Sequence, residues 1–207
     1  MTNFIILHKL DFALKKLTKE EKQERILAAA DRLFRQYGFE KTTISDIAGE
    51  LEMSPANIYK FFPSKNALVE ASADRNLNLI RREVHAIASS GESVIRRIEE
   101  IVLSIFRFHQ ELFRNERQIF KMVIQAVEES WPCVAEYDDF LGETLETLVK
   151  EGMERGEFRP GSPAEVKTPL MDTLYVALRP HLRHFWTPEE NDQRVRAHIA
   201  FVLSALK

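Results

Sequence analysis

Apolar residues recur every three or four positions along almost the whole chain, which is the spacing of helices that bury one face. Strongly alternating runs of β-branched residues, which would indicate strands, are absent. This pattern predicts an all-α fold. The predicted helices cover residues 19–37, 44–51, 55–62, 64–89, 93–112, 116–131, 134–155, 163–184 and 188–206.

Capping signals set the limits of the first helices. Thr18 and Glu21 have the spacing of a capping box, and Gly38 suits the end of the helix that they open. Ser54 followed by Pro55 begins the third helix, because proline at the first helical position loses no hydrogen bond. These signals make the order of short helices near the N-terminus the best-defined part of the pattern.

Two short helices within residues 43–62, joined by a tight turn at Leu51-Glu52-Met53, form a helix-turn-helix pattern. Thr43 can cap the first of them, which is too short to be stable without flanking helices. The second helix leaves one side exposed, and its residues suit the major groove of DNA. The residues on this side are Ser54, Pro55, Ala56, Asn57, Tyr59 and Lys60.

Each kind of side chain on this exposed side has a partner in double-stranded DNA. Asn57 can pair with adenine through two hydrogen bonds, Ala56 can touch a thymine methyl group, and Lys60 can reach guanine or a phosphate. Hydroxyl and ammonium groups nearby can donate to phosphate oxygens on either side. The residues expected to make phosphate contacts are Thr42, Thr43, Tyr59 and Lys65.

Composition and charge add little to this interpretation. The 207 residues are 44% hydrophobic and 29% charged, as in an ordinary globular protein. The net charge is −3: residues 1–65 hold eleven Lys and Arg against nine Asp and Glu, or about +2, which leaves about −5 for the rest. The asymmetry has the sign expected for DNA binding but is too weak to indicate it.

Other classes of site have little support. The single cysteine, Cys133, excludes an intramolecular disulfide and fits a small buried residue. No catalytic motif is present, so we expect no enzyme, no cofactor and no metal; His181 and His184 could share a metal ion but fit an interface or solvent better. No apolar run reaches the roughly 18 residues of a membrane span, and Asp11 with its lysines disfavours a signal peptide, so we expect a cytoplasmic protein without membrane contact.

The segment TTISDIAGELEMSPANIYKFFPSKNALVEA resembles the N-terminal domain of the TetR family of bacterial transcriptional regulators. The resemblance covers about residues 22–70 and rests on a Thr-Thr, an Ile-Ala, a Ser-Pro, an Ile-Tyr and a Phe-Pro-Ser-Lys at the family's spacing. It implies that Tyr59 and Lys65 contact the phosphate backbone. It also implies a DNA-binding regulator, most often a repressor.

Two positions depart from the family's pattern. Glu52 stands where the turn commonly has glycine, so either it adopts a strained φ or the turn differs. Phe61 stands where His or Tyr is frequent, and because Phe cannot hydrogen-bond a phosphate we expect it to pack.

The resemblance also implies a domain order: an extension at 1–17, a DNA-binding domain at 18–65 and a helical effector-binding and dimerisation domain at 66–207. The extension could be a basic arm, a prolonged first helix or a frayed tail. A homodimer formed by the helices at 163–184 and 188–206 would suit a palindromic operator. The expected interface residues are Leu170, Leu174, Leu178, His181, Phe185, Trp186, Ile199 and Val202.

The middle helices are rich in aromatic residues and could enclose a small apolar or aromatic effector. For any one of these residues, ordinary core packing is the competing interpretation. The expected lining is Phe106, His109, Phe113, Phe120, Met122, Trp131, Tyr137 and Phe140. The alternative function is an effector-independent repressor or an architectural DNA-binding protein of the same fold.

Overall fold

The computed structural model describes residues 17–178 and 188–207, and within these ranges it contains nine helices and no strand. Near the end of the first range the side chains of Thr173, Leu174 and residues 176–178 are not described, nor are those of Pro188 and Glu189. The predicted all-α class is confirmed. The chain divides into two compact units, Met1–Ala73 and Asp74–Lys207, and the boundary falls inside one long helix.

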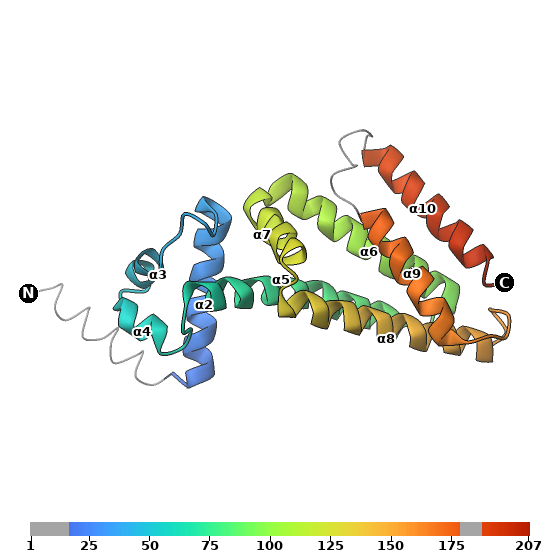
Figure 1. Ribbon diagram of the computed structural model, residues 1–207, viewed down its shortest axis with the longest axis horizontal. Helices are drawn as coiled ribbons and strands as arrows, with labels where there is room; N and C mark the ends of the chain where they lie inside the picture. The colour runs from blue at the N-terminus through green and yellow to red at the C-terminus, as the bar shows by residue number, and fades with distance from the viewer. Residues whose placement is uncertain (1–16, 179–187) are drawn as a thin grey trace, which may run out of the picture. The chain divides into compact units, whose positions relative to one another are not determined.

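The N-terminal unit consists of short helices around a small aliphatic and aromatic core, and Figure 1 shows them in blue and turquoise. Ile26, Phe34, Ile47, Ile58 and Leu68 are buried almost completely and come from every helix of the unit. The helices are α2 (Lys19–Tyr37), α3 (Ile44–Glu50), α4 (Pro55–Tyr59) and the first part of α5 (Lys65–Ala88).

Polar contacts add to this core. The Ser72 hydroxyl donates to Asp31, and both side chains are buried, so α5 is tied to α2. Arg32 donates from Nε and Nη2 to the same carboxylate oxygen of Glu50, at 2.9 and 2.5 Å, which ties α2 to α3. Helices as short as α3 and α4 therefore depend on tertiary contacts for their stability.

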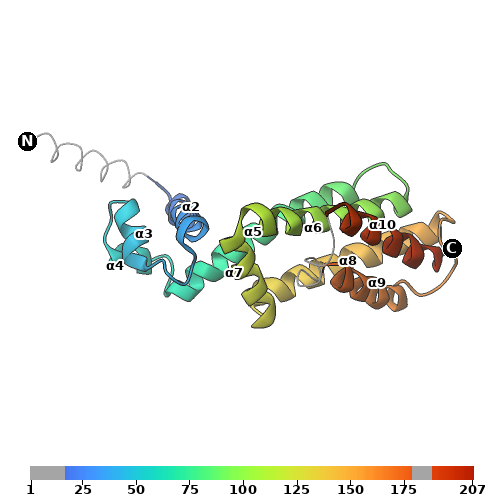
Figure 2. The ribbon, with the colours of Figure 1, turned by 90° about the horizontal axis from the view of Figure 1, so that it is seen from above.

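The C-terminal unit is a helical bundle in which α8 lies along α9, while α10 lies against α6 and α9 (Figures 1 and 2). Apolar residues of α6, α8 and α10 fill its interior, including Ile98, Ile101, Leu145 and Ile199. Its helices, besides the last part of α5, are α6 (Val94–Asn115), α7 (Arg117–Glu128), α8 (Pro132–Glu154), α9 (Pro163–Leu178) and α10 (Pro188–Ser204).

The predicted end of the helix at 116–131 and the predicted start of the helix at 134–155 are both wrong, for one reason. The helix predicted at 134–155 begins earlier, with Pro132 as the first residue of α8 and Trp131 as its N-cap. The preceding helix ends early, at Glu128, because Ser130 has φ 53° and the amides of Ser130 and Trp131 turn back to the carbonyls of Val127 and Ala126. This Schellman ending has serine where glycine is usual, so the sequence carried no signal for it.

Candidate DNA-reading site

Helix α4 presents one exposed side and one buried side, as the sequence predicts. Ile58 is fully buried and anchors the helix to the core of the N-terminal unit. The predicted reading residues lie on the other side: Asn57 is half-buried, and Ser54, Pro55, Ala56, Tyr59 and Lys60 are exposed. The structure therefore brings all six predicted major-groove residues to the surface of one short helix.

Within this surface, Asn57 and Lys60 interact with each other. The Lys60 ammonium donates to Asn57 Oδ1 at 2.9 Å. Tyr59, beside them, has 51% of its surface exposed. Ser54 occupies the N-cap position, but its hydroxyl makes no capping hydrogen bond. A capping hydroxyl would accept a hydrogen bond, so the proton of the Ser54 hydroxyl can be donated to a phosphate with or without a cap.

Thr42 and Thr43 cannot donate to phosphate as predicted. Thr42 is 2% exposed, and its hydroxyl donates to the carbonyl of Gly38 at 2.8 Å. Thr43 is exposed, but its hydroxyl proton is already donated to Asp46 Oδ2 at 2.7 Å. A hydroxyl has one proton to donate and a phosphate oxygen only accepts, so both predictions are corrected.

Thr43 instead forms a capping box with Asp46 that begins α3. The Thr43 amide donates to Asp46 Oδ2 at 2.8 Å, and the Asp46 amide donates to Thr43 Oγ1 at 3.1 Å. The hydrogen bonds from Thr43, and Lys65 at longer range, lower the pKa of Asp46 below its ordinary value of 3.8. The Thr-x-x-Asp spacing was the signal in the sequence, since it parallels Thr18 and Glu21.

Lys65 lies at the start of α5, and its ammonium donates to the carbonyl of Glu40 at 2.9 Å. An ammonium has three protons, so this bond leaves donors for a phosphate while it holds the side chain in place. Phe61, which we expected to pack, is half-buried, and its neighbour Phe62 is 8% exposed.

The turn between α3 and α4 is strained at Glu52. This residue has φ 53°, in the left-handed region, and the Met53 amide donates to the carbonyl of Ala48 at 2.9 Å. The Glu52 amide turns back to Gly49, which completes a Schellman ending. Of the two alternatives that the sequence left open at Glu52, the structure has the strained φ, and the turn keeps the geometry that glycine would adopt with less strain.

We expect Glu52→Gly to raise the free energy of unfolding of the N-terminal unit by up to about 1 kcal/mol, because a left-handed L-residue costs roughly 1–2 kcal/mol and glycine returns part of this as chain entropy. Slower hydrogen exchange of the α3 and α4 amides would measure the gain. Glu52→Ala is the matched control, since it removes the carboxylate and keeps the strain. Equal stabilisation by both variants would assign the effect to charge instead of φ.

Among the described residues, none of the predicted effector residues lines the cavity described below, and their burial differs. Phe106, Met122 and Tyr137 are buried in the bundle, whereas Phe113 is 40% exposed and packs edge-on against Phe120. The remaining three, His109, Trp131 and Phe140, are half-buried. Trp131 donates to Glu129 at 2.8 Å, His109 lies edge-on to Phe108, and Phe140 lies 6.5 Å from the ring of Tyr137.

A cavity of about 10 Å³ does lie in the bundle, among α6, α8, α9 and α10, and its lining is aliphatic. Three residues that we expected at a dimer interface are part of this lining. Leu170 and Ile199 are 5% and 3% exposed in the single chain, so their assignment to the interface is wrong. Val202 is half-buried, and the other predicted interface side chains, of Leu174, Leu178, His181, Phe185 and Trp186, lie outside the described residues.

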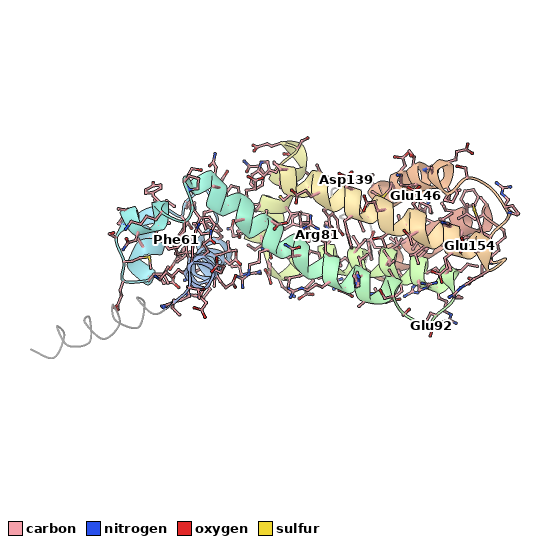
Figure 3. The ribbon with its side chains drawn as sticks, turned by 90° about the horizontal axis from the view of Figure 1, so that it is seen from below. Phe61, Arg81, Glu92, Asp139, Glu146 and Glu154 are labelled. Carbon is pink, nitrogen blue, oxygen red and sulfur yellow. The ribbon has the colours of Figure 1, made fainter. Side chains whose placement is uncertain are left out.

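Polar residues connect α5 and α8 beside Tyr137. Figure 3 shows Arg81 on α5 next to α8, where its guanidinium donates to the Cys133 carbonyl at 3.3 Å. The same group pairs with Asp74 at 2.9 Å and lies 5.8 Å from the ring centre of Tyr137. The Tyr137 hydroxyl is buried and has no hydrogen-bond partner among the described residues, and burial raises the pKa of this phenol.

Two expected absences can be examined only over the described part of the chain. There, no three His, Cys, Asp or Glu side chains gather as a metal site would require. None of the described helices has the length and apolarity needed to cross a membrane.

The exposed α4, fixed by a capped α3 and a buried Ile58, defines a helix-turn-helix protein. Residues 26–72 match the family described as bacterial regulatory proteins of the tetR family, and residues 95–198 match the tetracyclin repressor-like C-terminal domain. The chain belongs to the TetR family and is a DNA-binding transcriptional regulator. Members of this family are regulators, not enzymes.

Individual relatives agree with this assignment. The HTH-type transcriptional regulator YfiR of Bacillus subtilis is 28% identical over 165 residues, which are 72% of this chain and 75% of YfiR. A transcriptional regulator from Cytophaga hutchinsonii has a similar fold, with a TM-score of 0.67 at 22% identity over 89% of this chain and 98% of that one. RolR in complex with its ligand resorcinol has a TM-score of 0.62 at 15% identity, over 91% of this chain and 88% of that one.

Proposed function

We propose that the protein is a repressor that binds a palindromic operator as a homodimer and releases it when a small apolar or aromatic effector binds. The observation that carries the DNA-reading part is the exposed side of α4, with Ser54, Ala56, Asn57, Tyr59 and Lys60 above a buried Ile58. The major groove of B-DNA admits an α-helix, and polar side chains on its exposed side can then bond to base edges. A repressor of transcription acts on the chromosome, so we place it in the cytoplasm.

Operator selection from random DNA tests this proposal. The wild-type chain is expected to enrich a site with two inverted half-sites about one helical turn apart, because a twofold dimer presents two copies of α4. A single half-site would contradict the homodimer, and failure to enrich any sequence would contradict sequence-specific binding.

We expect Lys65→Ala to weaken binding to all DNA sequences alike, because an ammonium that contacts phosphate carries no base information. Each lost contact should reduce the slope of log affinity against log salt by about 1 per protomer. The matched control is Lys150→Ala, which removes an exposed charge from α8. Binding titrations at several salt concentrations measure both. A change in base preference without a change in slope would contradict the role of Lys65.

The homodimer proposal is supported by two exposed aromatic side chains, one on α10 and one on α9. Phe201 is 73% exposed, and Tyr175 on α9 is 45% exposed. Helices α9 and α10 lie side by side (Figure 1), so a second copy packed on them would form a four-helix interface.

We expect Phe201→Glu to shift the protein from dimer to monomer at micromolar concentration, because two carboxylates would face each other near the symmetry axis. Sedimentation velocity measures the shift, and Phe201→Leu is the control that keeps the surface apolar. A dimer that persists in Phe201→Glu would place the interface elsewhere.

The effector part of the proposal is supported by Tyr137. A buried hydroxyl without a partner costs about 1–3 kcal/mol, and a ligand oxygen or nitrogen would satisfy it. The raised pKa keeps the phenol neutral, so it can donate or accept a hydrogen bond. Resorcinol, the ligand of the structurally similar RolR, is one aromatic compound of suitable chemistry.

The size of the cavity favours a second candidate function, effector-independent repression. A space of about 10 Å³ holds roughly one water molecule, whereas preformed ligand sites usually measure at least about 300 Å³. An effector that occupies this cavity would therefore have to open the bundle. In that case it would select a minor conformation and bind with reduced apparent affinity.

A screen of small aromatic compounds, resorcinol among them, separates the two candidates. An effector should raise the melting temperature of the free protein and release the selected operator. Tyr137→Phe should abolish this response, whereas Tyr175→Phe, whose hydroxyl already pairs with Asp138, should keep it. Repression in cells that no compound relieves would favour the effector-independent function.

A further inference from the structure

The Asn57–Lys60 pair bears on which base the recognition helix selects. The two residues are three positions apart, so their side chains lie on the same side of the helix. An ammonium has only protons to offer. The amide of Asn57 must therefore turn its oxygen toward Lys60, as the distance of 2.9 Å between Nζ and Oδ1 shows. Its NH₂ group then points away from Lys60.

This orientation changes the chemistry that Asn57 offers to DNA. A bidentate contact with adenine needs the amide oxygen to accept from N6 and the amide nitrogen to donate to N7. The amide oxygen has two lone pairs; the bond from Lys60 occupies one of them and turns the oxygen toward the ammonium, so the groups that the pair offers to a base edge are mainly donors. They are the NH₂ of Asn57 and the remaining protons of the Lys60 ammonium.

Guanine is the base that matches such a set, because its major-groove edge carries two acceptors, N7 and O6, and no donor. We propose that Asn57 and Lys60 act as one donor unit that selects guanine in each half-site. Lys60 is thereby a specificity-determining residue, because its bond to Asn57 Oδ1 decides which groups of Asn57 face the base. This inference rests on the proposed role of α4 in reading an operator.

The backbone around the pair is held firmly enough for selection between bases. The Asn57 amide donates to the Ser54 carbonyl at 2.9 Å, and the amides of Phe61 and Phe62 donate to the Ile58 carbonyl at 2.9 and 3.0 Å. Ile58, which lies between the two residues in the sequence, is fully buried in the core of the N-terminal unit. The pair therefore moves with the helix and approaches the base edge as a unit.

Operator selection with the full chain and three variants tests the proposal. The wild type should prefer guanine over adenine at one position of each half-site, by about 10-fold or more. Lys60→Met keeps the length of the side chain and removes the donors, so Asn57 becomes free to select adenine and the preference should reverse. Lys60→Arg, which retains donors, should keep guanine. Asn57→Ala should weaken the preference by about 5-fold or more.

A chemical substitution in the selected operator gives an independent measurement. Replacing that guanine by 7-deazaguanine removes the N7 acceptor and should weaken wild-type binding by about 10-fold, with little effect on Lys60→Met. Melting curves establish that each variant is folded, as the exposed position of Lys60 predicts.

The outcomes separate this inference from the function on which it rests. If the wild type enriches a palindrome in which Asn57→Ala alters an adenine, or in which Lys60→Met alters no base, the donor unit is wrong and the operator-binding function stands. If no protein enriches any sequence, both are overturned.

Discussion

Removing the carboxylate of Glu151 is expected to lower the free energy of unfolding of the C-terminal unit by about 3 kcal/mol, because it leaves a buried cation without its counter-ion. The cation is Arg97 on α6, which is 4% exposed. Its guanidinium donates to Glu151 Oε1 at 2.5 Å and to the carbonyl of Ala88, the last residue of α5, at 2.8 Å. Arg97 thus joins the end of α5 to α8.

Removing the cation instead of the carboxylate should lower the free energy of unfolding by less. Arg97→Met replaces the guanidinium by an apolar group of similar length, and the Glu151 that remains is 28% exposed and still pairs with Arg155 at 2.7 Å. We expect a loss of no more than about 1 kcal/mol, since only hydrogen bonds are lost and no charge is stranded. The double variant Arg97→Met/Glu151→Ala should then be more stable than Glu151→Ala alone.

Denaturant unfolding followed by tryptophan fluorescence measures this cycle, because Trp131 and Trp186 both belong to the C-terminal unit. The hydrogen bond from Arg97 lowers the pKa of Glu151 below its ordinary value of 4.5. Its stabilisation is therefore complete above about that pH and is lost as the pH falls further. Equal losses in both single variants, or a Glu151→Ala effect that persists at low pH, would contradict the stranded-cation explanation.

How much of this molecule its sequence predicts depends on the range of the interactions involved. Helix starts were predictable at Thr18 and Thr43 because a cap involves residues within one turn of one another, and at Ser54 because Pro55 follows at the first helical position. Helix ends at Glu52 and Ser130 were harder to predict. Both residues adopt the left-handed conformation that glycine usually supplies at a Schellman ending, so their residue types give no local signal for it, and at Glu52 only the resemblance to the family indicated it.

The exposed side of α4, which we propose reads DNA, was predictable for a similar reason. Once α4 is known to be a helix with Ile58 buried, its exposed side follows from the helical period. The phosphate contact predicted for Thr42 was wrong because this residue lies outside any helix and its burial depends on the fold around Gly38. The competition of Asp46 for the hydroxyl of Thr43 could have been predicted, since the two residues have the spacing of a capping box.

The C-terminal unit shows the limit of periodicity. An apolar face indicates that a helix is covered, but it does not identify the covering element. Leu170 and Ile199 are covered by helices of their own chain, and a partner chain would have produced the same pattern. Likewise, an abundance of aromatic residues does not predict a pocket, because Phe106 and Tyr137 are buried in the bundle while the cavity of about 10 Å³ is lined by aliphatic side chains.

Gly152→Ala is expected to lower the free energy of unfolding of the C-terminal unit by about 2 kcal/mol, although alanine normally stabilises a helix by roughly 0.5–1 kcal/mol relative to glycine. A β-carbon at this position of α8 would overlap the ring of Phe158. Phe158 is 3% exposed, and its amide donates to the Gly152 carbonyl at 3.1 Å. The ring therefore cannot move aside without disturbing both the core and the end of the helix.

Gly49→Ala is the matched control, because this residue is also helical and an added β-carbon there would meet no atom within 4 Å. It should stabilise the N-terminal unit by about 0.5–1 kcal/mol. Phe158→Leu shortens the ring that causes the overlap, so it should cost less in the Gly152→Ala background than in the wild type, as a double-variant cycle would measure. If the two substitutions add without coupling, the close approach of Phe158 does not explain the need for glycine at position 152.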